Sequence, residues 1–213
     1  MIDVYAFATP NSLKVPMLLE ELGAPYSLRA VNVRKGDQSK PEFLAINPNG
    51  KIPVIIDQSG PGASPVTITE SGAILLYLSE KHGALIPKDA LGRIRCLEWL
   101  FFQVAGLGPM FGQSGYFLRA APEKPQFAID RYNGEAKRHM RILDQHLAKH
   151  TWAAGTEYSI ADIALFGWIW RREFAGVDFD GTPNVARWYA AAEARPATAR
   201  AIAAVNALVP NAA

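Results

Sequence analysis

The pattern of this sequence changes near Pro87, and that change constrains the fold more than any other feature. Before Pro87, short runs of β-type composition alternate with helical runs. After it no convincing strand pattern occurs, and five helical patterns follow without a long linker. The sequence therefore predicts a small α/β domain over residues 1–87, followed by an all-helical domain over residues 88–213.

The first half opens as a βαβ unit. Residues 2–7 have strand composition, residues 11–22 place apolar side chains on one helical face, and residues 28–33 form a second strand. Such a unit pairs its strands in parallel through a crossover helix. A short helical piece, the two strands of a hairpin and a closing helix are expected at residues 41–46, 53–57, 66–69 and 71–82.

The helical patterns of the second half run over residues 90–118, 125–149, 160–173, 183–194 and 196–207. One stretch, Trp99 to Leu118, carries no charged residue and is nearly as long as a membrane span. Glycines, a proline and two glutamines within it would break or polarise a spanning helix. We therefore expect a buried helix or an interface helix there.

Composition excludes several classes of protein. Lys and Arg total 22 against 20 for Asp and Glu, a net charge of +2, which gives no broad cationic field for nucleic acid. Cys96 is the single cysteine, so neither a disulfide framework nor a cysteine-rich zinc site is possible, and its apolar neighbours predict a buried, inert thiol. The first residues resemble a strand rather than a signal peptide, so we expect a cytoplasmic protein without a membrane partner.

Conventional catalytic motifs are absent: the chain has no G-x-S-x-G, P-loop, H-E-x-x-H or C-x-x-C sequence. His146 and His150 lie four residues apart on a predicted helix, with His139 further back, and could chelate a metal ion. Their polar neighbours indicate a solvated helix face instead. We therefore expect no metal site.

Three segments of the first half carry candidate functional groups. The first is Thr9-Pro10-Asn11-Ser12, where a strand ends and a helix begins. Thr9 and Asn11 are good capping residues, which is sufficient reason for their presence. A functional interpretation is that the free N–H groups of the helix and these side chains favour an anion, and a thiolate would suit that place.

The other two segments flank the predicted hairpin. In Lys51-Ile52-Pro53 the X-Pro bond is a candidate for the cis form, which would leave the Ile52 peptide groups available to an extended peptide. Glu70-Ser71 lies between a strand and a helix, where capping is again the simpler interpretation. Alternatively, Ser71 and its amide bind a carboxylate while Glu70 binds an amine.

Together, and in this order, these segments resemble a glutathione transferase over essentially the whole chain. The resemblance is closest to the bacterial Nu class, whose members are glutathione-dependent disulfide-bond oxidoreductases. The motifs that carry it are Thr9-Pro10-Asn11, Pro41-Glu42-Phe43-Leu44, Pro48-Asn49-Gly50-Lys51-Ile52-Pro53, Glu70-Ser71-Gly72-Ala73-Ile74-Leu75-Leu76-Tyr77-Leu78 and Gly106-Leu107-Gly108-Pro109-Met110. The family's N-terminal domain is thioredoxin-like and its C-terminal domain is a helical bundle.

The resemblance implies a role for each matching residue. Thr9 and Asn11 would face the sulfur of glutathione as the catalytic pair. The backbone of Ile52, before the cis residue Pro53, would pair with the cysteinyl unit. The remaining binding residues would be Glu70 and Ser71 at the γ-glutamyl end, Gln38 and Lys51 near the glycyl end, and Arg131 of the helical domain at a second glutathione.

The implied function is reduction of disulfides by two bound glutathione molecules without a protein cysteine. The bound product would be glutathione disulfide, and a homodimer is the family expectation. An alternative enzyme would conjugate glutathione to an apolar electrophile or reduce a hydroperoxide, using the apolar segment from Phe101 to Tyr116 as a second pocket. A third possibility is a binding protein that reuses the fold without catalysis.

Overall fold

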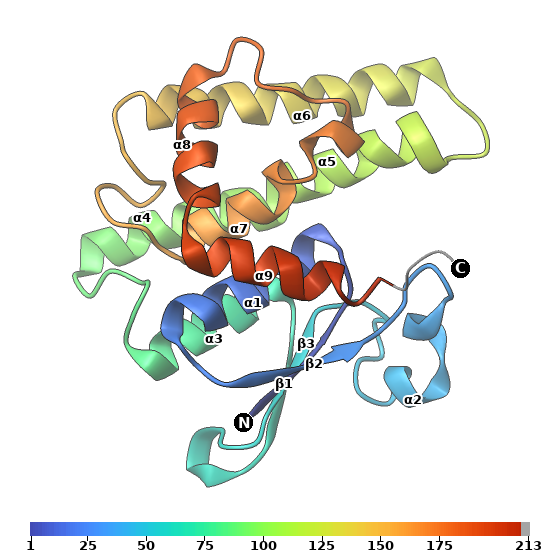
Figure 1. The fold of residues 1–213 in the computed structure, drawn as a ribbon. Coiled ribbons are helices and arrows are strands. Elements are labelled where there is room, and N and C mark those ends of the chain that lie inside the picture. The colour runs from blue at the N-terminus through green and yellow to red at the C-terminus, as the bar shows by residue number, and fades with distance from the viewer. Residues whose placement is uncertain (210–213) are drawn as a thin grey trace. The chain divides into compact units, whose positions relative to one another are not determined.

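The computed structural model describes residues 1–209. It divides into two compact units, one formed by residues 1–84 together with residues 195–209, and the other by residues 85–194. The first unit contains β1 (Ile2–Ala6), α1 (Pro10–Leu22), β2 (Tyr26–Ala30), η1 (Asp37–Ser39), α2 (Pro41–Leu44), β3 (Val54–Asp57), η2 (Pro61–Ala63), β4 (Val66–Thr69), α3 (Ser71–His82) and α9 (Pro196–Asn206). Figure 1 labels most of these elements.

The sheet of the first unit has the strand order β2-β1-β3-β4. β1 and β2 are parallel, whereas β1–β3 and β3–β4 are antiparallel, so the predicted βαβ unit and hairpin are both confirmed. β2 begins and ends earlier than the predicted strand at 28–33, because its register follows β1 from the pair Ile2–Tyr26 to the pair Ala6–Ala30. A five-residue partner strand thus limits the ladder.

Strand alternation divides the core of this unit between the two faces of the sheet. Val4 and Ala6 of β1 are fully buried on the face covered by α1 and α3 (Figure 1). Tyr5 points to the other face, where it packs with Phe43 of α2 and Val54 of β3. α1 and α3 cover one face of the sheet and α2 covers the other. The first turns of α1 and α3 therefore lie at the same end of the sheet.

The position of α9 differs from the expectation, which places residues 196–207 in the helical domain. In the structure α9 packs along α1 within the first unit (Figure 1). Arg195 holds Glu21 through two hydrogen bonds of 2.5 and 2.8 Å, and Arg200 donates to Glu20 at 2.6 Å. The small side chains of an alanine-rich helix can pack against many surfaces and do not specify one neighbour. The ion pairs of Arg195 and Arg200 with α1 specify the neighbour of α9.

The second unit is helical throughout its regular structure. Its elements are α4 (Ala90–Phe101), η3 (Phe102–Leu107), α5 (Gly108–Gly115), η4 (Tyr116–Ala120), α6 (Gln126–Leu147), α7 (Ile160–Ile169), η5 (Arg172–Ala175) and α8 (Pro183–Glu193). The predicted fold class, an α/β thioredoxin-like part and a helical part, is confirmed by this architecture and by the related structures described below. None of the helices within residues 1–209 is long and apolar enough to cross a membrane.

The predicted helix at 90–118 is divided by two π-helical segments, η3 and η4. Glycines in this stretch allow other side chains to approach the backbone closely. A β-carbon at Gly108 would lie 2.5 Å from Nε2 of the buried Gln103, and one at Gly115 would lie 2.0 Å from the Phe174 ring. The close packing of this stretch around Gln103 and Phe174 therefore requires glycines. These glycines are among the residues that indicate from the sequence that the stretch does not span a membrane.

The core of the second unit surrounds α7, which begins at a capping box formed by Ser159 and Asp162. The buried Asp162 carboxylate accepts hydrogen bonds from the N–H of Ser159, the N–H of Ala153 and the indole of Trp188, at 3.0, 2.8 and 2.8 Å. Burial still raises the pKa of Asp162 to about 6. This carboxylate ties the start of α7 to α8 and the preceding loop.

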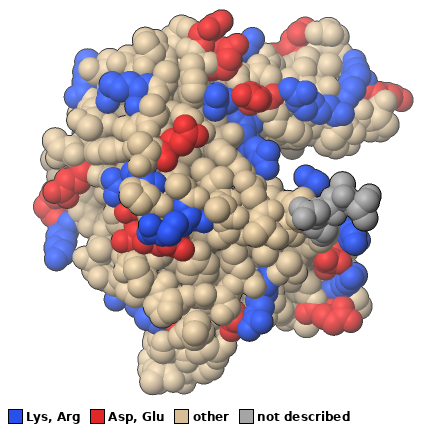
Figure 2. Space-filling model, in the orientation of Figure 1, with Lys and Arg blue, Asp and Glu red and all other residues tan. Residues whose placement is uncertain are grey.

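The helix face expected to be solvated is exposed at His150, just after α6, and at its polar neighbours, whereas His139 and His146 are packed against other side chains. His139 is buried against Phe102, and the ring of His146 packs on that of Trp99 with centroids 4.1 Å apart. Within residues 1–209, no three His, Cys, Asp or Glu side chains gather closely enough to hold a metal ion. Charged groups of both signs are interspersed on the face drawn in Figure 2, as the near-balanced composition suggests.

Candidate functional site

A pocket of about 140 Å³ lies in the first unit, where the first turns of α1 and α3 meet the loop before β3. Its lining residues come from three separate parts of the chain and are Asn11, Asn47, Lys51, Ile52, Pro53, Glu70 and Ser71. All but Asn47 were singled out from the sequence. The fold therefore brings the three candidate segments to one place.

Thr9 caps α1 beside this pocket but is not among its lining residues. Its backbone is extended, and its hydroxyl accepts a hydrogen bond from the N–H of Ser12 at 3.3 Å and donates to the Ser12 hydroxyl at 3.0 Å. The structure thus shows the capping role that the sequence suggested. A role toward sulfur stays a prediction.

The loop before β3 presents the Ile52 peptide. The Ile52–Pro53 bond is cis, as predicted, and the paired residues of β3 begin only at Val54. Asn47 orders this loop, because its side-chain amide donates to the Lys51 carbonyl at 2.7 Å and its side-chain oxygen accepts from Asn49 N–H at 3.1 Å. The side chain of Asn47 lines the pocket, although the sequence did not single it out.

Glu70 has a backbone conformation that non-glycine residues rarely adopt, with φ of 65° and ψ of 116°. It stands at the N-cap of α3 and lines the pocket with Ser71. Strain of this kind persists only where the surrounding structure enforces it, and it is concentrated at ligand sites. The conformation places a carboxylate and a helix N-terminus side by side.

Lys14 is a residue of this site that sequence reasoning missed. It lies on α1 with only 1% of its surface exposed. Its ammonium donates to Asn11 Oδ1 at 2.9 Å and to Ser71 Oγ at 3.2 Å, which joins the first turns of α1 and α3. Burial lowers the pKa of Lys14 to about 7, and the nearby Glu70 carboxylate opposes part of that shift. In the sequence, the feature that could have indicated this role is a lysine between apolar residues, three positions after Asn11.

Gln38 lies outside the pocket lining but close to the loop that forms it. Its backbone carbonyl would lie 3.2 Å from a β-carbon at Gly50, one residue before Lys51. Its side-chain oxygen Oε1 is buried and has no hydrogen-bond partner within residues 1–209. An unsatisfied buried acceptor is costly, so this atom suits a donor that the described chain does not supply.

The other two residues of interest belong to the second unit. Arg131 is exposed on α6, and its predicted contact with a second glutathione stays a prediction. Cys96 is fully buried in α4, and burial raises the pKa of its thiol. Neither residue lines the pocket described above.

Two family models match the chain. The model of the glutathione S-transferase N-terminal domain matches residues 8–81, and the model of the C-terminal domain matches residues 126–191. The two matched segments lie within residues 1–87 and 88–213, the ranges predicted for the thioredoxin-like and helical parts.

Two relatives named disulfide-bond oxidoreductases match almost the whole chain. The disulfide-bond oxidoreductase YfcG of Escherichia coli is 44% identical over 205 residues, which are 95% of this chain and 94% of that protein. The disulfide-bond oxidoreductase YghU of the same organism is 38% identical, over 93% of this chain and 73% of its own length.

Solved structures agree with these sequence matches. A glutathione transferase from Burkholderia graminis, crystallised with two glutathione molecules per subunit, is 44% identical and superposes with a TM-score of 0.90 over 94% of this chain and 87% of its own. One from Pseudomonas putida, with one glutathione disulfide per subunit, is 41% identical and has a TM-score of 0.88 over 94% and 90%.

The fold and the pocket define a thioredoxin-like unit that presents a cis-proline loop beside two helix N-termini. With the matches above, the chain belongs to the glutathione S-transferase family. Its similarity to YfcG confirms the predicted Nu class.

Proposed function

We propose that this protein is an enzyme that reduces disulfide bonds with two glutathione molecules and no cysteine of its own. The observation that carries the proposal is the pocket of the first unit, which gathers Asn11, Ile52, Glu70 and Ser71 and contains no cysteine among its lining residues. Relatives named disulfide-bond oxidoreductases, and related structures with glutathione or its disulfide, support it.

The charges of the pocket match those of glutathione, which carries two carboxylates and one ammonium group. Glu70 supplies a carboxylate for the ammonium group, and Ser71 with the first N–H groups of α3 supplies donors for the adjacent carboxylate. Lys51 supplies a cation for the glycyl carboxylate. The orphaned Oε1 of Gln38 is an acceptor for an N–H group of the same ligand.

The peptide of Ile52 supplies the contact that sets the position of the sulfur. The Ile52 peptide lies outside the β3–β4 ladder and can therefore pair with the backbone of the cysteinyl unit, as in β-strand addition. Asn11 then offers an amide beside the sulfur, at the start of a helix of 13 residues. Hydrogen bonds to a thiolate and the helix dipole both lower its pKa, and only the thiolate attacks disulfides.

The reaction balances with two thiols. The thiolate of the first glutathione attacks one sulfur of the substrate disulfide, which forms a mixed disulfide and releases the other sulfur as a thiolate that takes up a proton. The thiolate of the second glutathione attacks the glutathionyl sulfur, which forms glutathione disulfide and releases the second substrate thiol. The protein contributes by holding both thiols close together, and Arg131 is the candidate residue for the second one.

A comparison of the parent protein with its Cys96→Ala variant tests this proposal. We expect both proteins to reduce a small model disulfide at comparable rates with glutathione as the reductant. Loss of activity in a folded Cys96→Ala protein would make Cys96 a participant and overturn the mechanism. If both proteins are inactive on disulfides but conjugate glutathione to an apolar electrophile, the transferase alternative replaces it.

The role of Asn11 has its own test. Asn11→Ala should reduce turnover more than it weakens retention on immobilised glutathione, because the amide acts on the sulfur rather than on the ends of the ligand. Weakened retention with full turnover would contradict that role. The homodimer expected for this family stays a prediction, and the measured mass in solution tests it.

A further inference from the structure

Lys14 is the most deeply buried charged group near the pocket. It projects from α1 between the first turns of α1 and α3 and contacts Asn11 and Ser71, which lie 60 residues apart in sequence. The side chains before and after it on α1, Leu13 and Val15, are fully buried apolar groups. A charged lysine in such surroundings costs free energy, so its presence is better explained by a function than by a contribution to stability.

The chemistry of an ammonium group determines how Lys14 orders its neighbours. It is a donor only, with three N–H bonds and no lone pair. The amide of Asn11 must therefore present Oδ1 to Lys14, which turns its NH₂ group to the opposite side. The Ser71 hydroxyl accepts from the same ammonium through its oxygen, which leaves its own O–H free to turn toward an acceptor.

We propose that Lys14 is a positioning residue of the site, which locks the Asn11 amide with its NH₂ group toward the glutathione sulfur and the Ser71 hydroxyl as a donor to the ligand carboxylate. This inference rests on the proposed function. A reversed amide would place Oδ1 against the thiolate, where two acceptors repel. Lys14 thus acts through Asn11 and Ser71.

Three further observations fit this role. Asn11 and Ser71 both line the pocket, whereas Lys14 does not, so Lys14 lies behind them. Glu70, the charged pocket residue whose field reaches Lys14, favours the ammonium form. Burial lowers the pKa of Lys14 to about 7, so the charge of Lys14 responds to nearby groups. The negative charge of bound glutathione would raise this pKa and favour the ammonium form.

The test replaces Lys14 with a side chain of similar length and no charge. Lys14→Met should reduce kcat by about 10- to 100-fold, the effect expected when hydrogen bonds to a charged reacting group are misdirected. The KM for glutathione should change less. The pKa of the bound glutathione thiol, followed by the ultraviolet absorbance of the thiolate, should rise. Lys149→Met removes an exposed lysine of the second unit and should leave all three values unchanged.

A double variant separates positioning from a general structural role. If Lys14 acts largely through Asn11, Lys14→Met should reduce kcat much less in the Asn11→Ala background than in the parent. An equal loss in both backgrounds would overturn the inference, as would unchanged turnover and unchanged thiol pKa in Lys14→Met. If that variant does not fold, Lys14→Gln replaces it, and full turnover in folded Lys14→Gln would also overturn the inference.

The same experiments distinguish the two proposals. A parent protein that neither binds glutathione nor reduces disulfides contradicts the proposed function itself. An active parent with an equally active Lys14→Met variant contradicts only the role of Lys14.

Discussion

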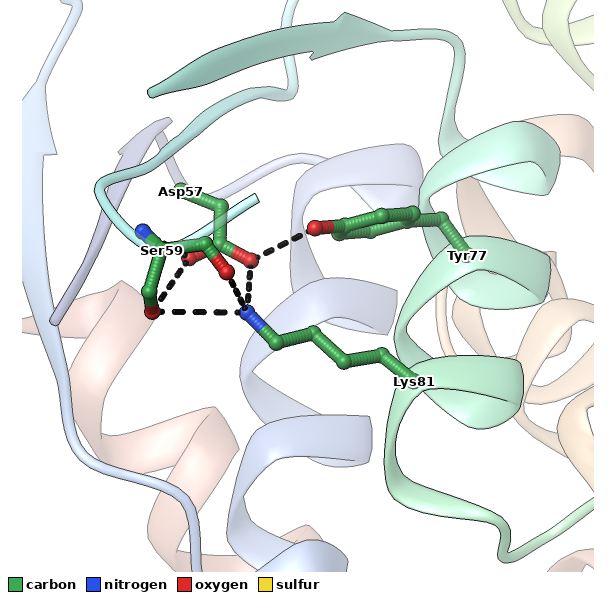
Figure 3. Close-up of polar contacts among 4 residues, drawn as sticks. All are labelled: Asp57, Ser59, Tyr77 and Lys81. Carbon is green, nitrogen blue, oxygen red and sulfur yellow. Dashed lines mark hydrogen bonds and ion pairs between the residues drawn. The ribbon is translucent and has the colours of Figure 1, made fainter. Parts of the chain in front are cut away.

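The first unit contains two buried charges that are stabilised in opposite ways. Asp57, at the end of β3, has a side chain with no exposed surface and accepts hydrogen bonds from the Tyr77 hydroxyl at 2.7 Å, the Ser59 N–H at 3.0 Å and the Lys81 ammonium (Figure 3). Burial raises the pKa of Asp57, but the bonds from Lys81 and Tyr77 outweigh it and lower that pKa to about 2. The Tyr77 pKa rises to about 12 through burial and its bond to Asp57.

Lys14 donates hydrogen bonds to the neutral side chains of Asn11 and Ser71, and burial outweighs the opposing effect of the Glu70 charge on its pKa. The Asp57 cluster, formed by Asp57, Ser59, Tyr77 and Lys81, holds a charge that does not change near neutral pH. The Lys14 cluster, formed by Lys14, Asn11 and Ser71, holds one that can change there. The first arrangement joins β3 to α3, and the second borders a pocket. Buried charges near neutrality are typical of functional sites.

A matched pair of substitutions, Lys→Met in each cluster, gives the strongest test of the difference between the Asp57 cluster and the Lys14 cluster. Lys81→Met should lower the free energy of unfolding by about 3 kcal/mol, because it leaves the buried Asp57 carboxylate without its cation. Urea denaturation at neutral pH measures this effect. Disulfide reduction per folded molecule should stay at the parent level, and a selective loss of turnover would place the Asp57 cluster in the active machinery.

Lys14→Met should change the free energy of unfolding in the opposite direction from Lys81→Met. We expect the free energy of unfolding at pH 7 to increase by about 2 kcal/mol, because an apolar side chain replaces a poorly compensated buried charge. The folded pKa of about 7 lies below the unfolded value of 10.5, so between these values the unfolded chain binds more protons and parent stability rises with pH. The advantage of the variant should therefore narrow from pH 7 toward pH 9. A constant or widening gap in urea denaturation would contradict this account.

Acid should weaken the Asp57 cluster alone. The pKa of Asp57 is lowered from 3.8 to about 2 in the folded state, so its stabilising contribution is complete above pH 4 and is lost as the pH falls through 2. The contribution is of the order of 2 kcal/mol. The stability difference between the parent and Asp57→Asn should thus shrink between pH 6 and pH 3. A difference that does not depend on pH would show that Asp57 contributes by packing.

The smallest expected effect concerns the hydroxyl of Tyr77. Tyr77→Phe removes one of the donors to Asp57 and should lower the free energy of unfolding by about 1 kcal/mol. Lys81 and the Ser59 N–H still satisfy the carboxylate, so the loss should be smaller than that of Lys81→Met. Equal losses would mean that Lys81 contributes no more than a neutral donor.

Local patterns predicted most elements and the residues around the pocket. Pro53, Glu70 and Ser71 follow from motifs that are short in sequence, and the helical pattern from residue 160 gives the start of α7. Boundaries depended on partners: β2 is limited by the length of β1, and the helix at 90–118 is interrupted where glycines pack against Gln103 and Phe174. The β1–β2 register and the contact of Gly115 with Phe174 involve residues far apart in the chain, which the periodicity of a sequence does not reveal.

The sequence by itself determined which segments become strands and helices, where the helices begin, and which family motifs the chain carries, because these depend on residues a few positions apart. Tertiary structure alone decided that α9 packs on α1, that Asn47 turns into the pocket, and that Lys14 is buried between two helices. The physical reason is that the state of a charge depends on what covers it. Lys14 and Lys81 are the same type of residue, but Lys81 forms an ion pair with the buried Asp57 carboxylate, whereas the Lys14 ammonium donates to the neutral side chains of Asn11 and Ser71.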